Sequence, residues 1–357
     1  MPVVHKSASA TAESSSASEA APHGTLRWIF DVSKWNPSKA EWEFLLGLIP
    51  KVDSDKVMRY VQEIDRRRAL ISRLLQRRAC FEVTGVPWDK VRIERTKGSK
   101  PFMANKPRPG SAGSAGSAGM CVPPNWNYNI SHEGLYVVLA AEPHCVCGVD
   151  VTEPWELRNR SINGALRKKE RPMDEQLHVF KSQLTDSERA LIDRFRPDEV
   201  KMEHAFRKFW SLKEAFTKAR GDGLKFEFNR CSFRYMGAAQ DTGGGLGLNA
   251  DRGSAGQPVA LASVVVDGML AKSWRFYVQG LQDNHFISVA RGPPTDVIDA
   301  IGTFKASFGE ELSREKLLAE LARPEPAFVT KVMSDLVPDE DRRRYTELTM
   351  KARIAMG

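Results

Sequence analysis

The sequence has no apolar run long enough to cross a membrane, and it has few cysteines. A membrane-spanning helix needs roughly 18 uncharged apolar residues, and no stretch approaches that length; the N-terminus also lacks the apolar core of a secretory signal. The five cysteines are an odd number and, apart from Cys145 and Cys147, are widely spaced, so neither a disulfide framework nor a zinc site is expected. These absences exclude an integral membrane protein and favour a reducing compartment.

Charge, in contrast, is plentiful and uneven. Lys and Arg number 53 against 45 Asp and Glu, a net charge of +8, and 41% of the residues are hydrophobic, which is enough for a globular core. Residues 56–108 alone carry fifteen basic residues against five acidic ones. This concentration predicts attraction for phosphates, nucleic acid or an acidic protein surface, without choosing among them.

Three segments differ in composition from the rest of the chain. Residues 1–23 are rich in serine and alanine and have no aromatic residue, so we expect a disordered tail. Residues 109–122 contain three copies of Ser-Ala-Gly and residues 241–258 are rich in glycine, which predicts two flexible insertions. Residues 296–357 are charged and helical in pattern, and we expect a C-terminal extension there.

Hydrophobic periodicity predicts the elements between these segments. A helix is expected from Ser54, as its N-cap, through Leu75, and another over 202–220, ended by Gly221. Strands are expected over 26–30 and 91–95, in a hairpin of 135–141 and 145–151, and in a second hairpin of 274–278 and 286–290.

The helix over 202–220 has two faces of different character. One face is apolar and suits a core, whereas the other carries Trp210, Glu214 and Lys218 at four-residue spacing. Taken alone, Glu214 and Lys218 would be an ordinary helix pair worth a few tenths of a kcal/mol.

Asp150 interrupts an apolar strand sequence, Gly148-Val149-Asp150-Val151. A carboxylate is unfavourable to bury unless a cation or a metal pairs with it. The alternative is a turn aspartate that faces water.

Two upstream segments have groups that suit phosphate binding. In the segment 95–101, Arg95, Lys97 and Lys100 flank a glycine and two hydroxyls, so side chains and backbone amides could reach one polyphosphate. The other segment is Asn129-Ile130-Ser131-His132. A solvated basic loop and a core histidine are the ordinary alternatives.

Together and in this order, the four segments resemble the signatures of the 4′-phosphopantetheinyl transferase superfamily. Its G-[IV]-D and W-x-x-K-E-[SA]-x-x-K motifs match 148–150 and 210–218, and its K-P and N-x-S-H elements match 100–101 and 129–132. The resemblance covers about residues 26–292. It is closest to the large monomeric type, in particular the eukaryotic L-aminoadipate-semialdehyde dehydrogenase-phosphopantetheinyl transferases.

This resemblance implies an enzyme that transfers 4′-phosphopantetheine from coenzyme A to a serine of an apo acyl or peptidyl carrier protein. It also implies that Asp150 and Glu214 bind Mg²⁺, that Glu214 is the catalytic base, and that Lys218 contacts the phosphates and assists the leaving group. The coenzyme-binding residues it implies are Lys56, Arg95, Thr96, Lys97, Gly98, Ser99, Lys100, Asn129, Ile130, Ser131, His132, Asp150, Glu214, Ala215 and Lys218.

One position departs from the bacterial pattern. Many bacterial members have a second acid two residues after the aspartate, where this chain has Thr152. Glu153 is adjacent but on the opposite face of the strand, so it is a poor substitute. We expect one protein ligand of the metal to be missing or replaced by water, as in the aminoadipate-type enzymes.

The family arrangement implies an α+β fold of two similar-sized, pseudo-symmetric halves, 24–145 and 146–295, with the active site in the cleft between them. The first half would grip coenzyme A and the second would supply both carboxylates. We expect a monomer with no membrane or nucleic-acid partner.

Its expected substrates are acyl carrier proteins or the carrier domains of fatty acid synthase or aminoadipate-type enzymes, which links it to fatty acid and lysine biosynthesis. We expect a cytoplasmic location. A mitochondrial or plastid location is the alternative, although Glu13 and Glu19 are atypical of a transit peptide.

Two other functions compete with the transferase. A basic nucleic-acid-binding module would explain the charge, but the chain has no aromatic RNP motif, zinc knuckle or KH-like GXXG loop, and Asp150 and Glu214 would stay unexplained. A magnesium-dependent phosphohydrolase with the same carboxylates is the nearer alternative. It would release pantetheine phosphate from coenzyme A without any carrier.

Overall fold

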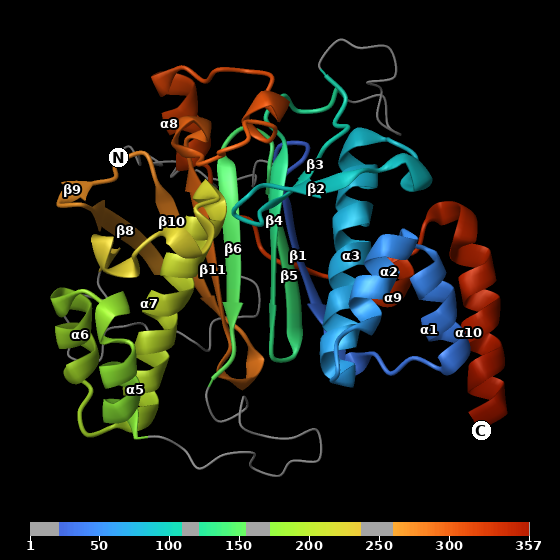
Figure 1. Cartoon of the computed structure of the whole chain (residues 1–357), viewed down its shortest axis with the longest axis horizontal. Helices are drawn as coiled ribbons and strands as arrows, with labels where there is room; N and C mark the ends of the chain where they lie inside the picture. Colours follow the sequence, from blue (N-terminus) through green and yellow to red (C-terminus); the bar gives the residue numbers. More distant parts are fainter. Residues whose placement is uncertain (1–20, 109–120, 155–171, 237–259, 357) are drawn as a thin grey trace, which may run out of the picture.

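A computed structural model describes residues 21–108, 121–154, 172–236 and 260–356 (Figure 1). The insertion expected over 241–258 and most of the tail and of the insertion at 109–122 lie outside these ranges. The fold mixes helices with mainly antiparallel sheets, so the expected α+β class is confirmed.

The first sheet has four strands in the order β12-β1-β5-β4. Helix α3 (Glu63–Thr84) packs on one face of it, and Trp28, Leu74 and Leu139 belong to their common core. The strands are β1 (Leu26–Asp31), β4 (Asn127–Glu133), β5 (Tyr136–Glu142) and β12 (Val329–Thr330), and the helices α1 (Lys39–Gly47) and α2 (Lys51–Met58) lie beside α3.

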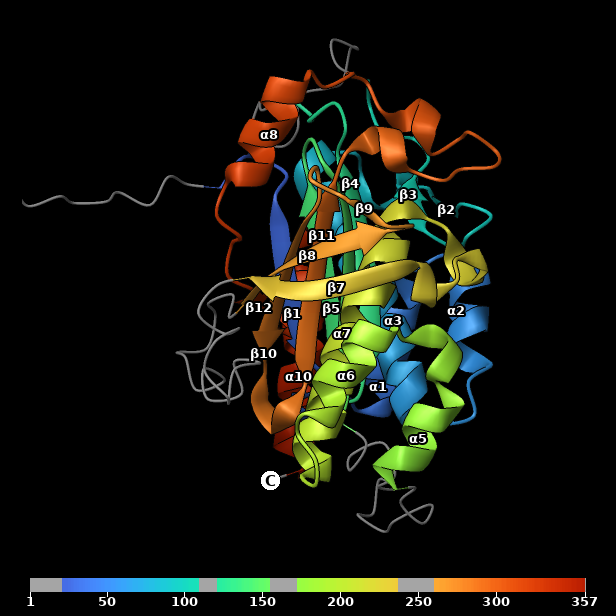
Figure 2. The same cartoon turned by 90° about the vertical axis from the view of Figure 1, so that its left-hand side faces the viewer.

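The second sheet has six strands, in the order β6-β11-β10-β8-β7 with β9 paired to β8. Helix α7 (Glu199–Arg220) covers its β6–β11 side, and α5 (Met173–Val179) and α6 (Asp186–Asp193) lie alongside α7 (Figure 2). The strands are β6 (Val146–Thr152), β7 (Cys231–Met236), β8 (Ala260–Val266), β9 (Met269–Leu270), β10 (Arg275–Gly280) and β11 (Phe286–Gly292).

The two sheets pack against each other between α3 and α7 (Figure 1). Val138, Cys147 and Ile287 are among the apolar residues that fill the space between them. The sheets also touch edge to edge. Asn127 Oδ1 accepts a hydrogen bond from Cys147 N at 3.1 Å, and Asn129 Oδ1 accepts one from Val149 N at 2.9 Å, so side chains of β4 bind the backbone of β6.

The hairpin expected from 135–141 and 145–151 is wrong. Both strands form, but β5 pairs with β1 and β4, whereas β6 pairs with β11. The chain crosses from one sheet to the other between them. Every residue of both strands is buried, so each strand is covered on both faces, and the short connection between them does not require them to pair.

The prediction of one helix from Ser54 to Leu75 is also wrong in one respect, because the structure has two helices in this region. Helix α2 starts at Lys51, with Pro50 at its N-cap, and ends at Met58 before α3 starts. Val61, in the turn between them, is 84% exposed. The apolar spacing therefore continues through a turn whose residues do not enter the core.

The other expected elements are confirmed. Strand β1 and the hairpin of β10 and β11 form as predicted, and the strand expected over 91–95 is the shorter β2 (Ile93–Arg95), paired with β3 (Pro101–Met103). Helix α7 begins three residues earlier than predicted, behind the N-cap Asp198, and Gly221 ends it with φ +85°. Cys80, Cys145, Cys147 and Cys231 are buried and all five cysteines are free.

The C-terminal segment contains α8 (Arg314–Ala322), α9 (Met333–Leu336) and α10 (Arg342–Met356). It returns to the first sheet, where β12 runs parallel to β1. On the way, Glu325 contacts Arg27 and Arg291, which also pair with Glu142, and all four side chains are buried. None of the helices in the described part of the chain is both long and apolar enough to cross a membrane.

Candidate active site

The site forms where α7 lies directly against β6. A Cβ atom at Gly148 would be 2.0 Å from the carbonyl oxygen of Ala215 and 2.5 Å from the nitrogen of Ala219, both in the α7 backbone. Only glycine permits this approach. It places Asp150 of β6 beside Glu214 and Lys218 of α7.

The ammonium of Lys218 connects the polar groups of three elements. Lys218 Nζ lies 2.5 Å from Asp150 Oδ1 and 3.9 Å from Glu214 Oε2, and it donates to Ser131 Oγ on β4 at 3.1 Å. Ser131 in turn donates to Asp150 Oδ1 at 3.0 Å. Asp150 is therefore buried with two partners, as its place in an apolar strand requires.

Burial and charge act in opposite directions on this cluster. Burial raises the pKa of Glu214; Lys218 opposes that increase and Asp150 adds to it. Burial by itself would lower the pKa of Lys218, but the charges of Asp150 and Glu214 raise it above its ordinary value. The site thus combines an ammonium that holds its proton more firmly than usual with a carboxylate that binds a proton more readily than usual.

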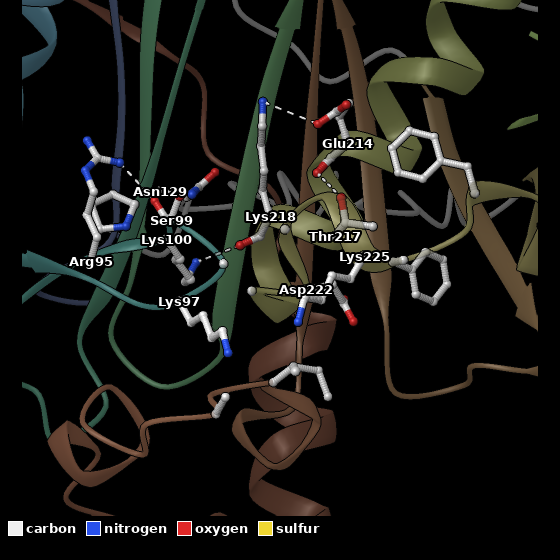
Figure 3. A pocket seen from close by; sticks show the side chains of 18 of the residues that line it. Arg95, Lys97, Ser99, Lys100, Asn129, Glu214, Thr217, Lys218, Asp222 and Lys225 are labelled. Atoms are coloured by element: carbon white, nitrogen blue, oxygen red, sulfur yellow. Dashed lines mark hydrogen bonds and ion pairs between the residues drawn. The ribbon is translucent and has the colours of Figure 1, made fainter.

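A cavity of about 760 Å³ opens beside this cluster, within the range of roughly 300–1,000 Å³ typical of ligand sites. Figure 3 shows Lys218 and Glu214 on one side of it and the segment 95–100 on the other. Of the residues expected at the site, Arg95, Lys97, Gly98, Ser99, Lys100, Asn129, Ile130, Glu214 and Lys218 line it.

The segment 95–101 is a tight loop fixed against the end of α7. Thr96 Oγ1 accepts from Lys100 N at 3.1 Å and Arg95 donates to Ser99 O at 2.9 Å. A Cβ at Gly98 would lie 2.0 Å from Gly221 O, so the loop and the helix end meet in van der Waals contact. The side chains of Arg95, Lys97 and Ser99 remain exposed toward the cavity (Figure 3).

Lys100 has a different environment from the other cations of this loop. Its side chain is buried, and its ammonium donates to Cys147 O at 2.7 Å. It also donates to Lys218 O at 3.1 Å, which Figure 3 shows as a dashed line. Burial lowers the pKa of Lys100 to about 8. Lys100 therefore ties the loop to β6 and α7 with its charged end.

The remaining expected residues lie outside the described lining of the cavity. Asp150 and Ser131 contact the ammonium of Lys218, Thr96 and Ala215 are buried, and Lys56 is exposed on α2. Loss of solvation and then the charges of Arg68, Lys218 and Arg73 lower the pKa of His132, on β4, to about 4. The structure thus brings the loop, β4 and α7 together at the cavity, and Lys56 is not among the described lining residues.

Several residues of the cavity were not expected from the sequence. Two of them could have been predicted. Thr217 lies three residues after Glu214 on the cavity side of α7, and Asp222 directly follows the glycine that ends this helix. The other unexpected lining residues come from segments that connect helices and strands, and no motif or periodicity in the sequence marks them: Gln183, Lys225, Phe226, Phe228, Ile298 and Ala300.

Asp150 and Glu214 suit a magnesium ion, which binds to one or two carboxylates, substrate phosphates and waters. Both carboxylates lie within 4 Å of one ammonium and so already face a common cation position. Within the described ranges, no three His, Cys, Asp or Glu side chains are grouped to hold a metal. Thr152, at the position of the bacterial second acid, has a buried hydroxyl without a hydrogen-bond partner. The donor set therefore fits a metal that takes most of its ligands from substrate and water.

Comparison with known proteins gives one consistent result. Residues 33–144 match the family "4′-phosphopantetheinyl transferase, N-terminal", and residues 147–252 match the "4′-phosphopantetheinyl transferase superfamily". The boundary between the two matches falls in the crossing from β5 to β6.

Similar proteins of known name indicate the same family. The L-aminoadipate-semialdehyde dehydrogenase-phosphopantetheinyl transferases of Mus musculus and Homo sapiens are 31% and 30% identical to this chain over 269 residues, which is 75% of each protein. The phosphopantetheinyl transferase of a Thraustochytrium species is 29% identical, over 75% of this chain and 79% of its own.

Proposed function

This chain belongs to the 4′-phosphopantetheinyl transferase superfamily and is an enzyme of that activity, and we propose that it transfers the 4′-phosphopantetheine group of coenzyme A to a serine of apo carrier proteins. The observation that carries this proposal is the Lys218 cluster, with Asp150 and Glu214 on either side of one ammonium, at the wall of a cavity whose opposite side is a basic loop.

In the proposed reaction, the carrier serine hydroxyl attacks the phosphorus atom that bears pantetheine. The bond from this phosphorus to the bridging oxygen breaks, and adenosine 3′,5′-bisphosphate leaves. Glu214 accepts the serine proton, a role supported by the upward shift of its pKa. Lys218 stabilises charge on the phosphate oxygens and on the leaving group, which is the main requirement of phosphoryl transfer.

Asp150 and Glu214 would hold Mg²⁺, which when bound neutralises the pyrophosphate charge. Ser131 orients Asp150 through its 3.0 Å hydrogen bond, so the carboxylate keeps one oxygen fixed beside Lys218. The remaining metal ligands would come from the pyrophosphate and water, because Thr152 offers no charge.

We further propose that Arg95 and Lys97 bind the 3′-phosphate of coenzyme A. Both side chains are exposed at the cavity, whereas the ammonium of Lys100 already donates hydrogen bonds to two backbone carbonyls. His132 belongs to this proposal as an uncharged hydrogen-bonding group, because its pKa of about 4 leaves the imidazole neutral near pH 7. Lys56 stays a prediction from the family resemblance, outside the described lining of the cavity. Charge-assisted hydrogen bonds of this kind contribute about 1.5–3 kcal/mol each.

The proposed acceptors are acyl carrier proteins and carrier domains of fatty acid synthase or of aminoadipate-type dehydrogenases. The relatives' names support the last of these and with it a role in lysine biosynthesis. We propose a monomer in the cytoplasm with no nucleic-acid partner; the free cysteines support a reducing compartment.

The test follows the carrier by intact-mass spectrometry after incubation with the protein, Mg²⁺ and coenzyme A. The carrier should gain one phosphopantetheine group, and Glu214→Gln should lose most of the turnover while binding coenzyme A within about tenfold of wild type. Glu199→Gln, at an exposed site in the same helix, is the matched control.

A carrier that never gains mass would reject the transferase. Release of pantetheine phosphate from coenzyme A in the absence of a carrier would indicate the phosphohydrolase instead.

A further inference from the structure

Lys213, which precedes Glu214 in the chain, is fully buried and lies outside the described lining of the cavity. Its ammonium contacts three acceptors: Glu188 Oε2 at 2.8 Å, Phe228 O at 2.7 Å and Cys231 O at 2.6 Å. An ammonium has three N–H donors. Every donor of Lys213 is therefore used.

Its partner Glu188 is equally buried and equally well bonded. Glu188 Oε1 accepts from Phe233 N at 2.9 Å, and Glu188 Oε2 accepts from Thr185 N at 2.9 Å in the capping box that starts α6. The pair thus connects α7 to the beginning of α6 and to β7. Its net effect is to fix the backbone between Phe228 and Phe233 against α7.

That backbone continues directly from one wall of the cavity. Lys225, Phe226 and Phe228 line it, and the ring of Phe228 meets that of Trp210 edge-on at 5.3 Å. Residues 223–230 form only the short 3-10 turns η4 (Gly223–Lys225) and η5 (Phe228–Arg230), and the sheet ladder starts at Cys231. The two carbonyls held by Lys213 stand at the end of this wall, where no strand partner holds Phe228.

The opposite side of α7 is held independently. There the close contact of Gly148 with Ala215 and Ala219 fixes the helix on β6 and determines where Glu214 and Lys218 point. Loss of the Lys213 contacts would consequently loosen the backbone of the cavity wall, whose Phe226 and Phe228 rings keep their contacts with Phe216 and Trp210 of α7. It would not turn the face of α7 that carries the reacting groups.

We propose that Lys213 is a positioning residue that holds the wall of Phe226 and Phe228 in the conformation that binds the donor, coenzyme A. This inference rests on the proposed function, and it predicts an effect on donor affinity rather than on the chemical step. Glu188 serves mainly to keep the buried ammonium of Lys213 neutralised.

The test compares Lys213→Met, the double variant Lys213→Met/Glu188→Gln, and the control Lys201→Met, which removes an exposed lysine of the same helix that pairs with Asp198. Coenzyme A affinity is measured by calorimetry, transfer by steady-state kinetics, and stability by thermal unfolding. Lys213→Met should raise both Kd and KM for coenzyme A about tenfold or more, with kcat at saturating donor within about threefold.

The double variant separates positioning from stability. It leaves no unpaired buried carboxylate, although the amide that replaces Glu188 can accept only one of the two backbone N–H bonds, so it should recover part of the melting temperature lost by Lys213→Met. Its Kd and KM for coenzyme A should nevertheless remain raised, because Phe228 O and Cys231 O still lack the ammonium that ties them to α7. The bonds that Phe228 O accepts from Cys231 N and Cys231 Sγ stay within the turn and do not connect it to the helix. If the single variant does not fold, this prediction is tested on the double variant alone.

Three results would overturn the inference: an unchanged Kd for coenzyme A, a fall in kcat with unchanged KM, or a double variant that recovers affinity together with stability. Failure of the wild type to modify a carrier would instead reject the proposed function, and the calorimetric series with coenzyme A would still test Lys213.

Discussion

Replacing Gly148 with alanine tests whether the close approach of α7 to β6 creates the site. The added Cβ would lie 2.0 Å from Ala215 O, whereas ordinary contact begins at 3.4 Å, so the helix must retreat by about 1.4 Å. Both opposing atoms belong to helix backbone and cannot rotate aside. Lys218 and Glu214 would move away from Asp150 with the helix.

Two effects of this displacement can be estimated. Overpacking of this kind destabilises a folded protein by about 1–3 kcal/mol. A misplacement of roughly 1 Å between reacting groups can lower a rate by about 100-fold, so kcat should fall by one to two orders of magnitude although no functional side chain has changed.

The assay measures urea unfolding and the kcat of carrier modification for Gly148→Ala and for a matched control, Gly47→Ala. A Cβ at Gly47, in α1, would meet nothing within 4 Å, so that variant should be neutral or more stable by about 0.5–1 kcal/mol. If Gly148→Ala matches the control in both stability and kcat, the close approach does not position the site.

Three further predictions address other parts of the molecule. Arg95→Ala should narrow the preference for coenzyme A over dephospho-coenzyme A by about tenfold or more, measured as the ratio of kcat/KM values, because one charge-assisted contact to the 3′-phosphate is lost. Glu325→Ala should lower the free energy of unfolding by about 3–5 kcal/mol in urea, since it leaves buried arginines with less compensation; Glu347→Ala, in an exposed pair of α10, should change it by less than about 0.5 kcal/mol. Burial lowers the pKa of Lys106 to about 7, so between pH 7 and 9 the unfolded chain binds more protons than the folded one and the free energy of unfolding should rise with pH. Lys106→Met should lack this contribution, which is at most about 1.4 kcal/mol per pH unit. Identical pH slopes of the unfolding free energy for the two proteins would contradict the assignment.

The sequence by itself determined the features that depend on neighbouring residues. Helix α7, its stop at Gly221, and the hairpin of β10 and β11 follow from periodicity and turn residues over short distances. The same local spacing put Glu214 and Lys218 on one face, and the unusual aspartate of β6 indicated that a cation would be near Asp150, where Lys218 lies 2.5 Å away.

Features that depend on distant segments were decided only by the tertiary structure. Strands β5 and β6 are joined by three residues, yet their partners are β4 and β1 in one sheet and β11 in the other. Strand pairing is a competition among all strands of the chain, and a short connection between two strands does not decide it.

Side-chain roles followed the same division. Lys97 and Lys100 are two lysines of the same basic loop, and the sequence does not distinguish their roles. In the structure, Lys100 donates to carbonyls of β6 and α7, whereas Lys97 is exposed. Likewise, the sequence distinguishes Lys213 from Lys218 only by helix face, and the acceptors that make Lys213 a buried anchor come from α6 and residues 228–231. An ammonium acts according to the oxygens around it, and in a folded chain those oxygens come from segments far away in sequence.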